Sequence, residues 1–231
     1  MVQLPFRDRF EAGRVLGAAL AGHNLPDDTV VLGLARGGVA AGFGVAATLN
    51  VPLDVVVVRK LGVPWEPELA MGALAGGEIR ALDPVLIHQL GVTDAEVQAV
   101  VAKETVEGER RERLYRKGRP APDLHNRTVI LVDDGLATGS SMLAAVRYVD
   151  SFQPARIIVA VPLGTAQACR ELGKVADEVL CLGMPEPFHG VGAWYENFQQ
   201  TTDTEVQHLL EQSRRQTGSA VEEGDLHLTG A

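Results

Sequence analysis

Apolar residues follow two alternating patterns along most of this chain. Short runs rich in Val, Ile and Leu predict buried strands, and between them apolar residues recur at the spacing of amphipathic helices. The predicted strands span residues 29–35, 53–60, 127–134, 155–162 and 177–183. The predicted helices span residues 8–21, 39–49, 140–151 and 165–174. This alternation is typical of an α/β fold, and strands that are apolar throughout favour a parallel sheet covered on both faces.

One long segment, residues 61–125, interrupts this alternation. It contains no clear strand–helix–strand unit, although residues 72–83 have the pattern of a hairpin. The capping-box pattern from Thr93 to Glu96 predicts the start of a long helix that ends near Tyr115. We therefore expect an insertion between two halves of the α/β core.

The carboxyl-terminal part of the chain has a different character. Much of the aromatic content lies in residues 184–203, and a second capping-box pattern, from Thr202 to Glu205, predicts a last helix. The apolar stripe of this helix is Val206, Leu209 and Leu210. Because the chain beyond is polar and without periodicity, we expect 214–231 to be a disordered tail. The expected organisation is a single domain at 1–213, its core at 28–183, a helical insertion at 72–125, and a small subdomain made of 184–203 and the first helix.

Composition and charge exclude several classes of protein. With 231 residues, 46% of them hydrophobic, the chain can bury a sizeable core, which excludes disorder of the whole chain. Its 30 acidic and 21 basic residues give a net charge of −9, so we expect no nucleic-acid partner. No apolar run approaches the roughly 18 residues of a membrane span, and the polar amino terminus has no secretory signal. We therefore expect a cytoplasmic protein without a membrane partner, in which Cys169 and Cys181 are reduced thiols.

The segment from Val129 to Met142 carries the strongest chemical signal. An apolar strand ends in Asp133 and Asp134, and a turn of small residues opens directly into a helix. Such a turn points backbone N–H groups at one spot, at the positive end of the helix dipole, which makes an anion site. Gly139 allows a close approach of the backbone to the anion, and hydroxyl donors come from Thr138, Ser140 and Ser141. A phosphate site beside two carboxylates suits a phosphorylated sugar, whose hydroxyl groups donate to the acids.

With this segment the sequence resembles the type I phosphoribosyltransferases. Their signature for phosphoribosyl pyrophosphate is an apolar strand, two acids and a small-residue turn, and residues 132–141 match every position. The resemblance implies a parallel-sheet core flanked by helices, with a small hood subdomain. It implies that Asp133 and Asp134 bind the ribose hydroxyls, and that the 5-phosphate is bound by Ala137, Thr138, Gly139, Ser140 and Ser141. It also implies a Mg²⁺ cofactor that the donor's own oxygens mostly hold, with the two acids as candidate protein ligands.

Two further motifs support the resemblance. Where the family has its pyrophosphate loop, this chain has Ala35, Arg36, Gly37 and Gly38. That loop often contains a non-proline cis peptide in the family, which we expect between Ala35 and Arg36. A basic pair, Arg59 and Lys60, resembles the Arg-Lys pair of orotate and adenine phosphoribosyltransferases, although alone such a pair is usually solvated surface. The predicted catalytic set is Arg36, Arg59, Lys60, Asp133 and Asp134.

The sequence says less about the acceptor. In the 6-oxopurine enzymes of the family an acid stands at the position of Ala137, and because alanine cannot transfer a proton, a 6-oxopurine acceptor is disfavoured. Glu66 and Glu68 are either groups that manage a proton on the acceptor or plain surface acids. Aromatic candidates for acceptor contact, which could equally belong to the core, are Phe188, Trp194 and Tyr195.

A local reversal of charge stands out in residues 103–119. Seven basic and four acidic residues give this segment a charge of +3 in a chain of charge −9. One interpretation is a clamp for a multiply charged donor. The other, which we favour at this point, is a solvated helix face with ion pairs such as Glu107 with Arg111.

The leading hypothesis is a Mg²⁺-dependent phosphoribosyltransferase. It would transfer ribose 5-phosphate from phosphoribosyl pyrophosphate to a small nitrogenous heterocycle and release pyrophosphate. The chain also looks like a bacterial group of phosphoribosyltransferases of unassigned acceptor. An alternative is a non-catalytic or regulatory phosphoribosyl-pyrophosphate-binding protein of the same fold, and a weaker one is an enzyme that uses water as acceptor. Since dimers are common in the family, a homodimer is a further prediction.

Overall fold

The computed structural model, which describes residues 3–77 and 79–225, is built around a five-stranded parallel sheet. The strand order is β2-β1-β6-β7-β8. The strands are β1 (Val30–Leu34), β2 (Leu53–Val56), β6 (Thr128–Val132), β7 (Arg156–Leu163) and β8 (Glu178–Gly183). This arrangement confirms the predicted α/β fold class and the positions of four of the five predicted core strands, while the strand predicted at 53–60 differs as described below.

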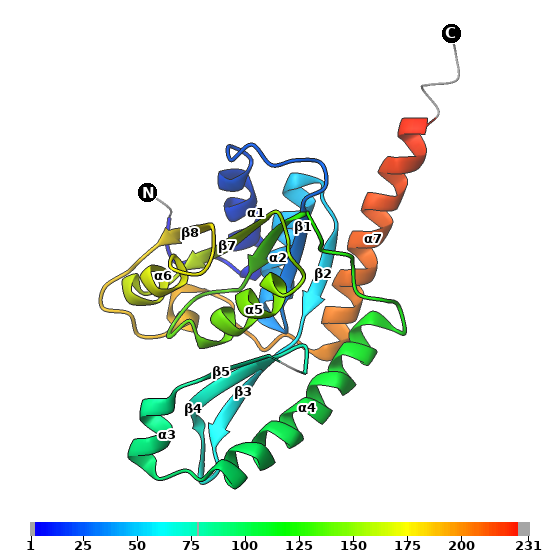
Figure 1. Cartoon of the computed structure of the whole chain (residues 1–231). Coiled ribbons are helices and arrows are strands. Elements are labelled where there is room, and N and C mark those ends of the chain that lie inside the picture. The colour runs from blue at the N-terminus through cyan, green and yellow to red at the C-terminus, as the bar shows by residue number, and fades with distance from the viewer. Residues whose placement is uncertain (1–2, 78, 226–231) are drawn as a thin grey trace.

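Helices cover both faces of this sheet (Figure 1). One face packs against α1 (Arg9–Leu20), α2 (Gly37–Leu49) and α7 (Asp203–Asp225). The other packs against α5 (Ser140–Asp150) and α6 (Ala166–Leu172). Successive residues of β6 serve the two faces in turn: Leu131 packs toward α5, and Ile130 toward α1 and α2. Because both faces are covered, the strands are apolar at most positions.

A second, antiparallel sheet lies beside the first. Its strands, in the order β3-β4-β5, are β3 (Val58–Val63), β4 (Glu66–Ala75) and β5 (Ile79–Leu82). The helices that follow are α3 (Pro84–Leu90) and α4 (Asp94–Arg116). Leu61, Met71 and Leu74 form a separate small core with Val97 and Val101 of α4. The hairpin expected at 72–83 is present as β4 and β5, and the capping box at Thr93 starts α4 as predicted.

The strand predicted at 53–60 is in fact two strands in two sheets. Pairing of β2 with β1 ends at Val56, opposite Leu34, the last residue of β1. With no partner beyond that point, the chain turns at Val57, and β3 pairs with β4 instead. The insertion therefore begins near residue 58 and not at 72, and Arg59 and Lys60 lie on the second sheet.

The carboxyl-terminal helix is longer than expected. Residues 214–225 continue α7, so the prediction of a disordered tail is wrong for them, while 226–231 lie outside the described residues. The residues from Glu211 to Glu223 are largely good helix formers, and extending an existing helix costs far less than starting one. The spacing of apolar residues detects helices that bury one face, and it did not detect this extension. Within the described residues no helix is long and apolar enough to cross a membrane.

The amino terminus and the segment before α7 lie side by side. The N–H of Phe6 donates to the carbonyl of Trp194 at 2.9 Å, and the N–H of Glu196 donates back to Phe6 at 2.8 Å. A short 3₁₀ helix, η1 (Val191–Trp194), precedes this contact. Residues 194–202 form the last part of the connection from β8 to α7. They thus pass over the amino end of α1, near the carboxyl ends of the parallel strands.

Candidate functional site

Two loops meet at the carboxyl ends of the neighbouring strands β1 and β6. The first contains Gly37 and Gly38, and the second contains the two acids. A Cβ added to Gly37 would lie 2.1 Å from Oδ2 of Asp134, and one added to Gly38 would lie 2.5 Å from the carbonyl oxygen of Val132 and 3.0 Å from Oδ1 of Asp133. Only glycine therefore allows the loop after β1 to pass this close to the carboxylates. The peptide bond between Ala35 and Arg36 is cis, as predicted.

The two acids are held in a largely buried position. The N–H of Asp134 donates to Oδ1 of Asp133 at 2.9 Å. Burial raises the pKa of Asp133 well above its ordinary value, and the carboxylate of Asp134 raises it further. Burial also raises the pKa of Asp134, against the opposing effect of the Arg9 guanidinium. Because burial disfavours the charged form of both carboxylates, the site favours a ligand that brings hydroxyl donors or a cation.

Arg9 is a site residue that sequence reasoning missed. Its Nε donates to Oδ2 of Asp134 at 2.6 Å, and its Nη1 donates to the carbonyl of Gln199 at 2.7 Å. Its guanidinium also stacks on Phe198, 3.8 Å from the ring centre. The residue lies 125 positions from Asp134, and an arginine at the start of an amphipathic first helix carries no local signal of this role.

The predicted phosphate loop opens α5. Gly139, at the helix N-cap, has a φ of 78°, a left-handed conformation that favours glycine. Thr138 and Ser140 are in hydroxyl contact at 3.2 Å. The hydroxyl of Thr165 donates to the carbonyl of Ala137 at 2.9 Å and braces the loop from behind. The N–H of Ser140 lies 3.4 Å from the Thr138 hydroxyl, and the loop stands at the positive end of the helix, where an anion is stabilised.

A cavity of about 350 Å³ lies in front of these loops. It brings together six predicted residues: Ala35, Arg36, Gly37, Arg59, Lys60 and Ser141. Two further cations, Arg9 and Arg111, also line it, and no carboxylate among the described residues does. Arg59 and Lys60 lie on the second sheet, yet they still line the cavity, because β3 begins directly after the carboxyl end of β2. A cavity lined by five cations in a chain of charge −9 is suited to a multiply charged anion.

Comparison with known proteins identifies the family. The model of the phosphoribosyl transferase domain matches residues 18–193, which is most of the chain. The chain belongs to the phosphoribosyl transferase domain family. A Mycobacterium tuberculosis protein described as "Putative phosphoribosyl transferase Rv0571c" is 41% identical over 215 residues, which are 93% of this chain and 48% of that protein. The chain thus spans about half the length of the curated relatives it matches.

A solved structure supports the same fold for this phosphoribosyl transferase domain. The crystal structure of TT1426 from Thermus thermophilus is 42% identical in sequence, with a TM-score of 0.75. The match covers 90% of this chain and 98% of that one. The parallel core flanked by helices is therefore shared by the two proteins.

The aromatic residues predicted to contact an acceptor do not share one environment. Tyr195 is only 6% exposed; its ring packs against Phe6 and Phe198, and its hydroxyl donates to the carbonyl of Asp134 at 2.6 Å. Its ring faces are covered, which favours the core alternative for Tyr195 over contact with an acceptor, and the residue supports the acid loop. Phe188 and Trp194 are half-buried at the edge of the same cluster.

The remaining candidates for acceptor chemistry lie at the second sheet. Glu66 is exposed at the start of β4, and the side chain of Glu68 lies outside the described residues. Neither the cavity in front of the loops nor the groove between β3 and α4 includes Glu66 in its lining. A role for these acids remains a sequence prediction.

The acid pair fits a magnesium ion bound together with a phosphorylated ligand. Asp133 and Asp134 supply hard carboxylate oxygens whose burial favours a nearby cation. Mg²⁺ commonly binds through one or two carboxylates and completes its shell with substrate phosphates and water. Among the described residues no group of three or more His, Cys, Asp or Glu side chains is arranged so that it could hold a metal ion by itself. The chemistry of the donor set thus fits an ion that a phosphorylated ligand helps to hold.

Proposed function

We propose that this protein transfers ribose 5-phosphate from phosphoribosyl pyrophosphate to a nitrogenous base and releases pyrophosphate, with Mg²⁺ as cofactor. The observation that carries the proposal is the contact of Gly37 and Gly38 with the two acids. It joins a sugar-binding acid pair to a cation-lined cavity, and the start of α5 adds a phosphate site next to both. The relative named a phosphoribosyl transferase and the matching family add support.

Each part of the donor has a matching part of the site. The N–H groups and hydroxyls at the start of α5 suit the 5-phosphate. The raised pKa values of Asp133 and Asp134 suit hydrogen bonds from the ribose 2- and 3-hydroxyls, which compensate the two acids for burial. The cation-lined cavity suits the diphosphate, since Arg36 comes from the loop itself and Arg59 and Lys60 approach from β3.

The chain's own residues would assist the reaction mainly through electrostatics. Negative charge grows on the diphosphate as the bond to C1 of the ribose breaks, and preorganised cations stabilise that charge. Arg36 and Arg59 are fixed before the donor binds, because Arg36 lies 3.9 Å from Asp203 and Arg59 pairs with Glu104. A bound Mg²⁺ would add charge neutralisation at the same diphosphate. The acids would hold the ribose so that C1 is presented to the acceptor.

The side chain at one position of the site limits which bases can be the acceptor. The side chain at position 137 is a methyl group, exposed beside the phosphate loop, so no acid stands there to handle a purine proton. We therefore propose a base other than a 6-oxopurine. Phe188 and Trp194 remain candidates for contact with it. The free thiols of Cys169 and Cys181 support a reducing, cytoplasmic location, and a homodimer remains a prediction.

Product analysis tests the proposal. The protein would be incubated with phosphoribosyl pyrophosphate, Mg²⁺ and a panel of bases including adenine, hypoxanthine and orotate, and both pyrophosphate and nucleotide would be measured. We expect base-dependent release of pyrophosphate with an equal amount of one nucleotide. Release without any base would indicate hydrolysis. Tight donor binding without turnover on the whole panel would favour the regulatory alternative.

A further inference from the structure

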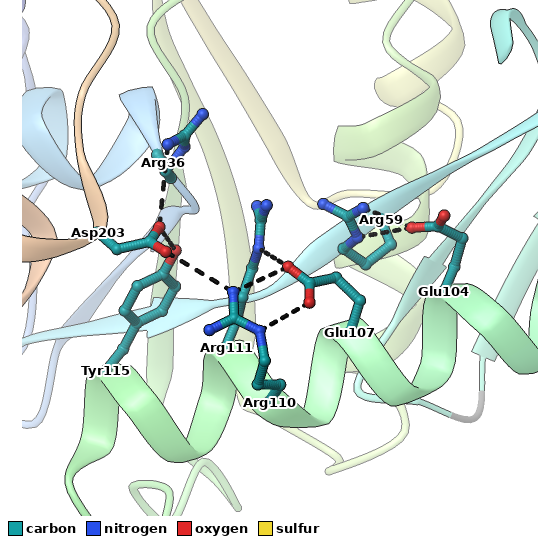
Figure 2. A network of polar contacts seen from close by, with 8 residues as sticks. All are labelled: Arg36, Arg59, Glu104, Glu107, Arg110, Arg111, Tyr115 and Asp203. Carbon is teal, nitrogen blue, oxygen red and sulfur yellow. Dashed lines mark hydrogen bonds and ion pairs between the residues drawn. The ribbon is translucent and has the colours of Figure 1, made fainter.

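The inserted helix α4 reaches the cavity that we assign to the diphosphate, as the clamp interpretation of residues 103–119 requires. Arg111 of α4 lines this cavity together with Arg36, Arg59 and Lys60. Figure 2 shows the arginine rising from α4 between Arg36 and Arg59. The helix is packed closely here, since a Cβ on Gly108 would lie 3.6 Å from the side chain of Arg59.

Arg111 differs from the other basic residues of the helix face. Its side chain is 19% exposed, whereas that of Arg113 is 70% exposed. Arg113 pairs with Glu109 four residues before it, at 3.4 Å, as expected for a solvated helix. Arg111 makes the same kind of pair with Glu107, at 2.8 Å, but does so beside a cavity. The solvated-face interpretation thus holds for Arg113 and not for Arg111.

The hydrogen bonding of Arg111 leaves donors available. Among the described residues only its Nε donates, to Oε1 of Glu107. Glu107 also accepts two hydrogen bonds from Arg110, at 2.7 and 3.0 Å, so one carboxylate serves two guanidinium groups. Arg110 also lies 3.7 Å from Asp203. The two terminal nitrogens of Arg111 make no hydrogen bond to the described residues and keep their N–H groups for an anion.

The other arginines of the cavity are held in the same way. Each has a carboxylate partner that lies outside the cavity lining. The pairs are Arg9 with Asp134, Arg36 with Asp203, Arg59 with Glu104, and Arg111 with Glu107. Asp203, at the start of α7, further accepts a 2.7 Å hydrogen bond from Tyr115 of α4, so α4, α7 and the loop of Arg36 are linked (Figure 2). Fixing the side chains in advance reduces the entropy lost when an anion binds.

We propose that α4 forms the second wall of the diphosphate site and that Arg111 binds the donor's diphosphate, with Glu107 as the residue that positions it. This inference rests on the proposed function for the identity of the donor. The cavity itself predicts only a ligand of the diphosphate class, which pyrophosphate alone can probe. The insertion is then part of the active site and not an appended module.

Calorimetric titration of three ligands tests this proposal: phosphoribosyl pyrophosphate, pyrophosphate and ribose 5-phosphate, each with Mg²⁺. The variants are Arg111→Ala and Arg111→Lys, with Arg113→Ala as the matched control on the same helix. We expect Arg111→Ala to weaken binding of both diphosphate ligands about tenfold or more, the loss of a charge-assisted hydrogen bond. Binding of ribose 5-phosphate should change less than about twofold, Arg111→Lys should retain part of the affinity, and Arg113→Ala should match the wild type.

The possible outcomes separate this proposal from the proposed function. If Arg111→Ala binds pyrophosphate as well as Arg113→Ala does, the role of Arg111 is refuted while the donor site stands. An equal loss for ribose 5-phosphate, or a loss of folding by circular dichroism that Arg111→Lys shares, would assign Arg111 to structure and also refute the proposal. If the wild type binds pyrophosphate through Arg111 but does not bind phosphoribosyl pyrophosphate, the proposed function falls and the anion site remains.

Discussion

At the scale of single residues, the site depends on two glycines as much as on its charged groups. Gly38 has no room for a side chain, because its missing Cβ would meet the backbone of Val132 and Asp133 at 2.5 and 3.0 Å. Backbone atoms cannot move aside as the end of a flexible side chain can. The glycines therefore set the distance between the diphosphate loop and the acids.

Gly38→Ala should lower both the stability and the donor affinity of the protein. Overpacking of this kind costs about 1–3 kcal/mol of unfolding free energy, which urea denaturation measures. The control is Gly173→Ala, at an exposed helix end with a φ of −64°, where the added Cβ would lie 3.5 Å from its nearest neighbour. Equal stability of the two variants would contradict the close packing of the loop.

The sequence predicted the charged residues of the loops better than their surroundings. The acids, the Arg-Gly-Gly turn and the phosphate loop are local motifs, so their positions follow from the strands that precede them. Arg9 and Arg111 could not be assigned in this way, because each reaches the site through packing of a distant helix. For Tyr195 the sequence left core packing and acceptor contact equally open, because composition cannot distinguish a buried ring from an exposed one.

The acid pair should make the ligand-free protein less stable as pH rises. Burial raises the folded-state pKa of Asp133 above its unfolded value, so the folded protein binds this proton more tightly than the unfolded chain. The stability that this carboxyl contributes is therefore fully present at pH values below its unfolded-state pKa of about 4. It is lost as the pH rises through the raised folded-state pKa.

Asp133→Asn should consequently raise the unfolding free energy at pH 7 while it weakens donor binding. The gain should shrink toward pH 4, where the wild-type carboxyl is protonated to a similar extent in both states. Denaturation curves at the two pH values measure this difference, with Asp27→Asn, at an exposed position, as the control. A wild type more stable than Asp133→Asn at pH 7, relative to that control, would contradict the raised pKa.

At the scale of elements, the helices that hold the site are anchored by apolar residues that the sequence pattern identified. Val206 and Leu210 of α7 are fully buried against the parallel sheet, as their spacing predicted. The same helix carries Asp203, which contacts Arg36 and Tyr115. The strand break at Val57 was not predictable, because the chain is apolar from Val55 through Val58 and the break depends on where β1 ends.

Leu210→Ala should destabilise the protein through the anchoring of α7. Loss of a fully buried leucine costs about 2–5 kcal/mol, depending on how far the cavity collapses. His208→Ala, two residues earlier on the exposed side of the helix, should leave the melting temperature unchanged. If the two variants melted together, α7 would not be packed on the sheet as described.

At the scale of the whole molecule, the cavity in front of the loops is opposite in charge to the chain as a whole. The chain carries −9, yet the cavity in front of the loops is lined by cations from α1, the loop after β1, β3 and α4. Four segments far apart in sequence thus converge on one anion site. The family match covers residues 18–193, so part of α1 and all of α7, which supply Arg9 and Asp203, lie outside it.

The central claim is that the acid pair and the cation-lined cavity form one site for phosphoribosyl pyrophosphate. Calorimetric titration with this donor, with and without Mg²⁺, tests it most directly, alongside the double variant Asp133→Asn/Asp134→Asn and a surface control, Glu171→Gln. We predict binding that Mg²⁺ strengthens, that the control retains and that the double variant loses. A folded wild-type protein that did not bind the donor, or a double variant that bound it equally well, would contradict the account.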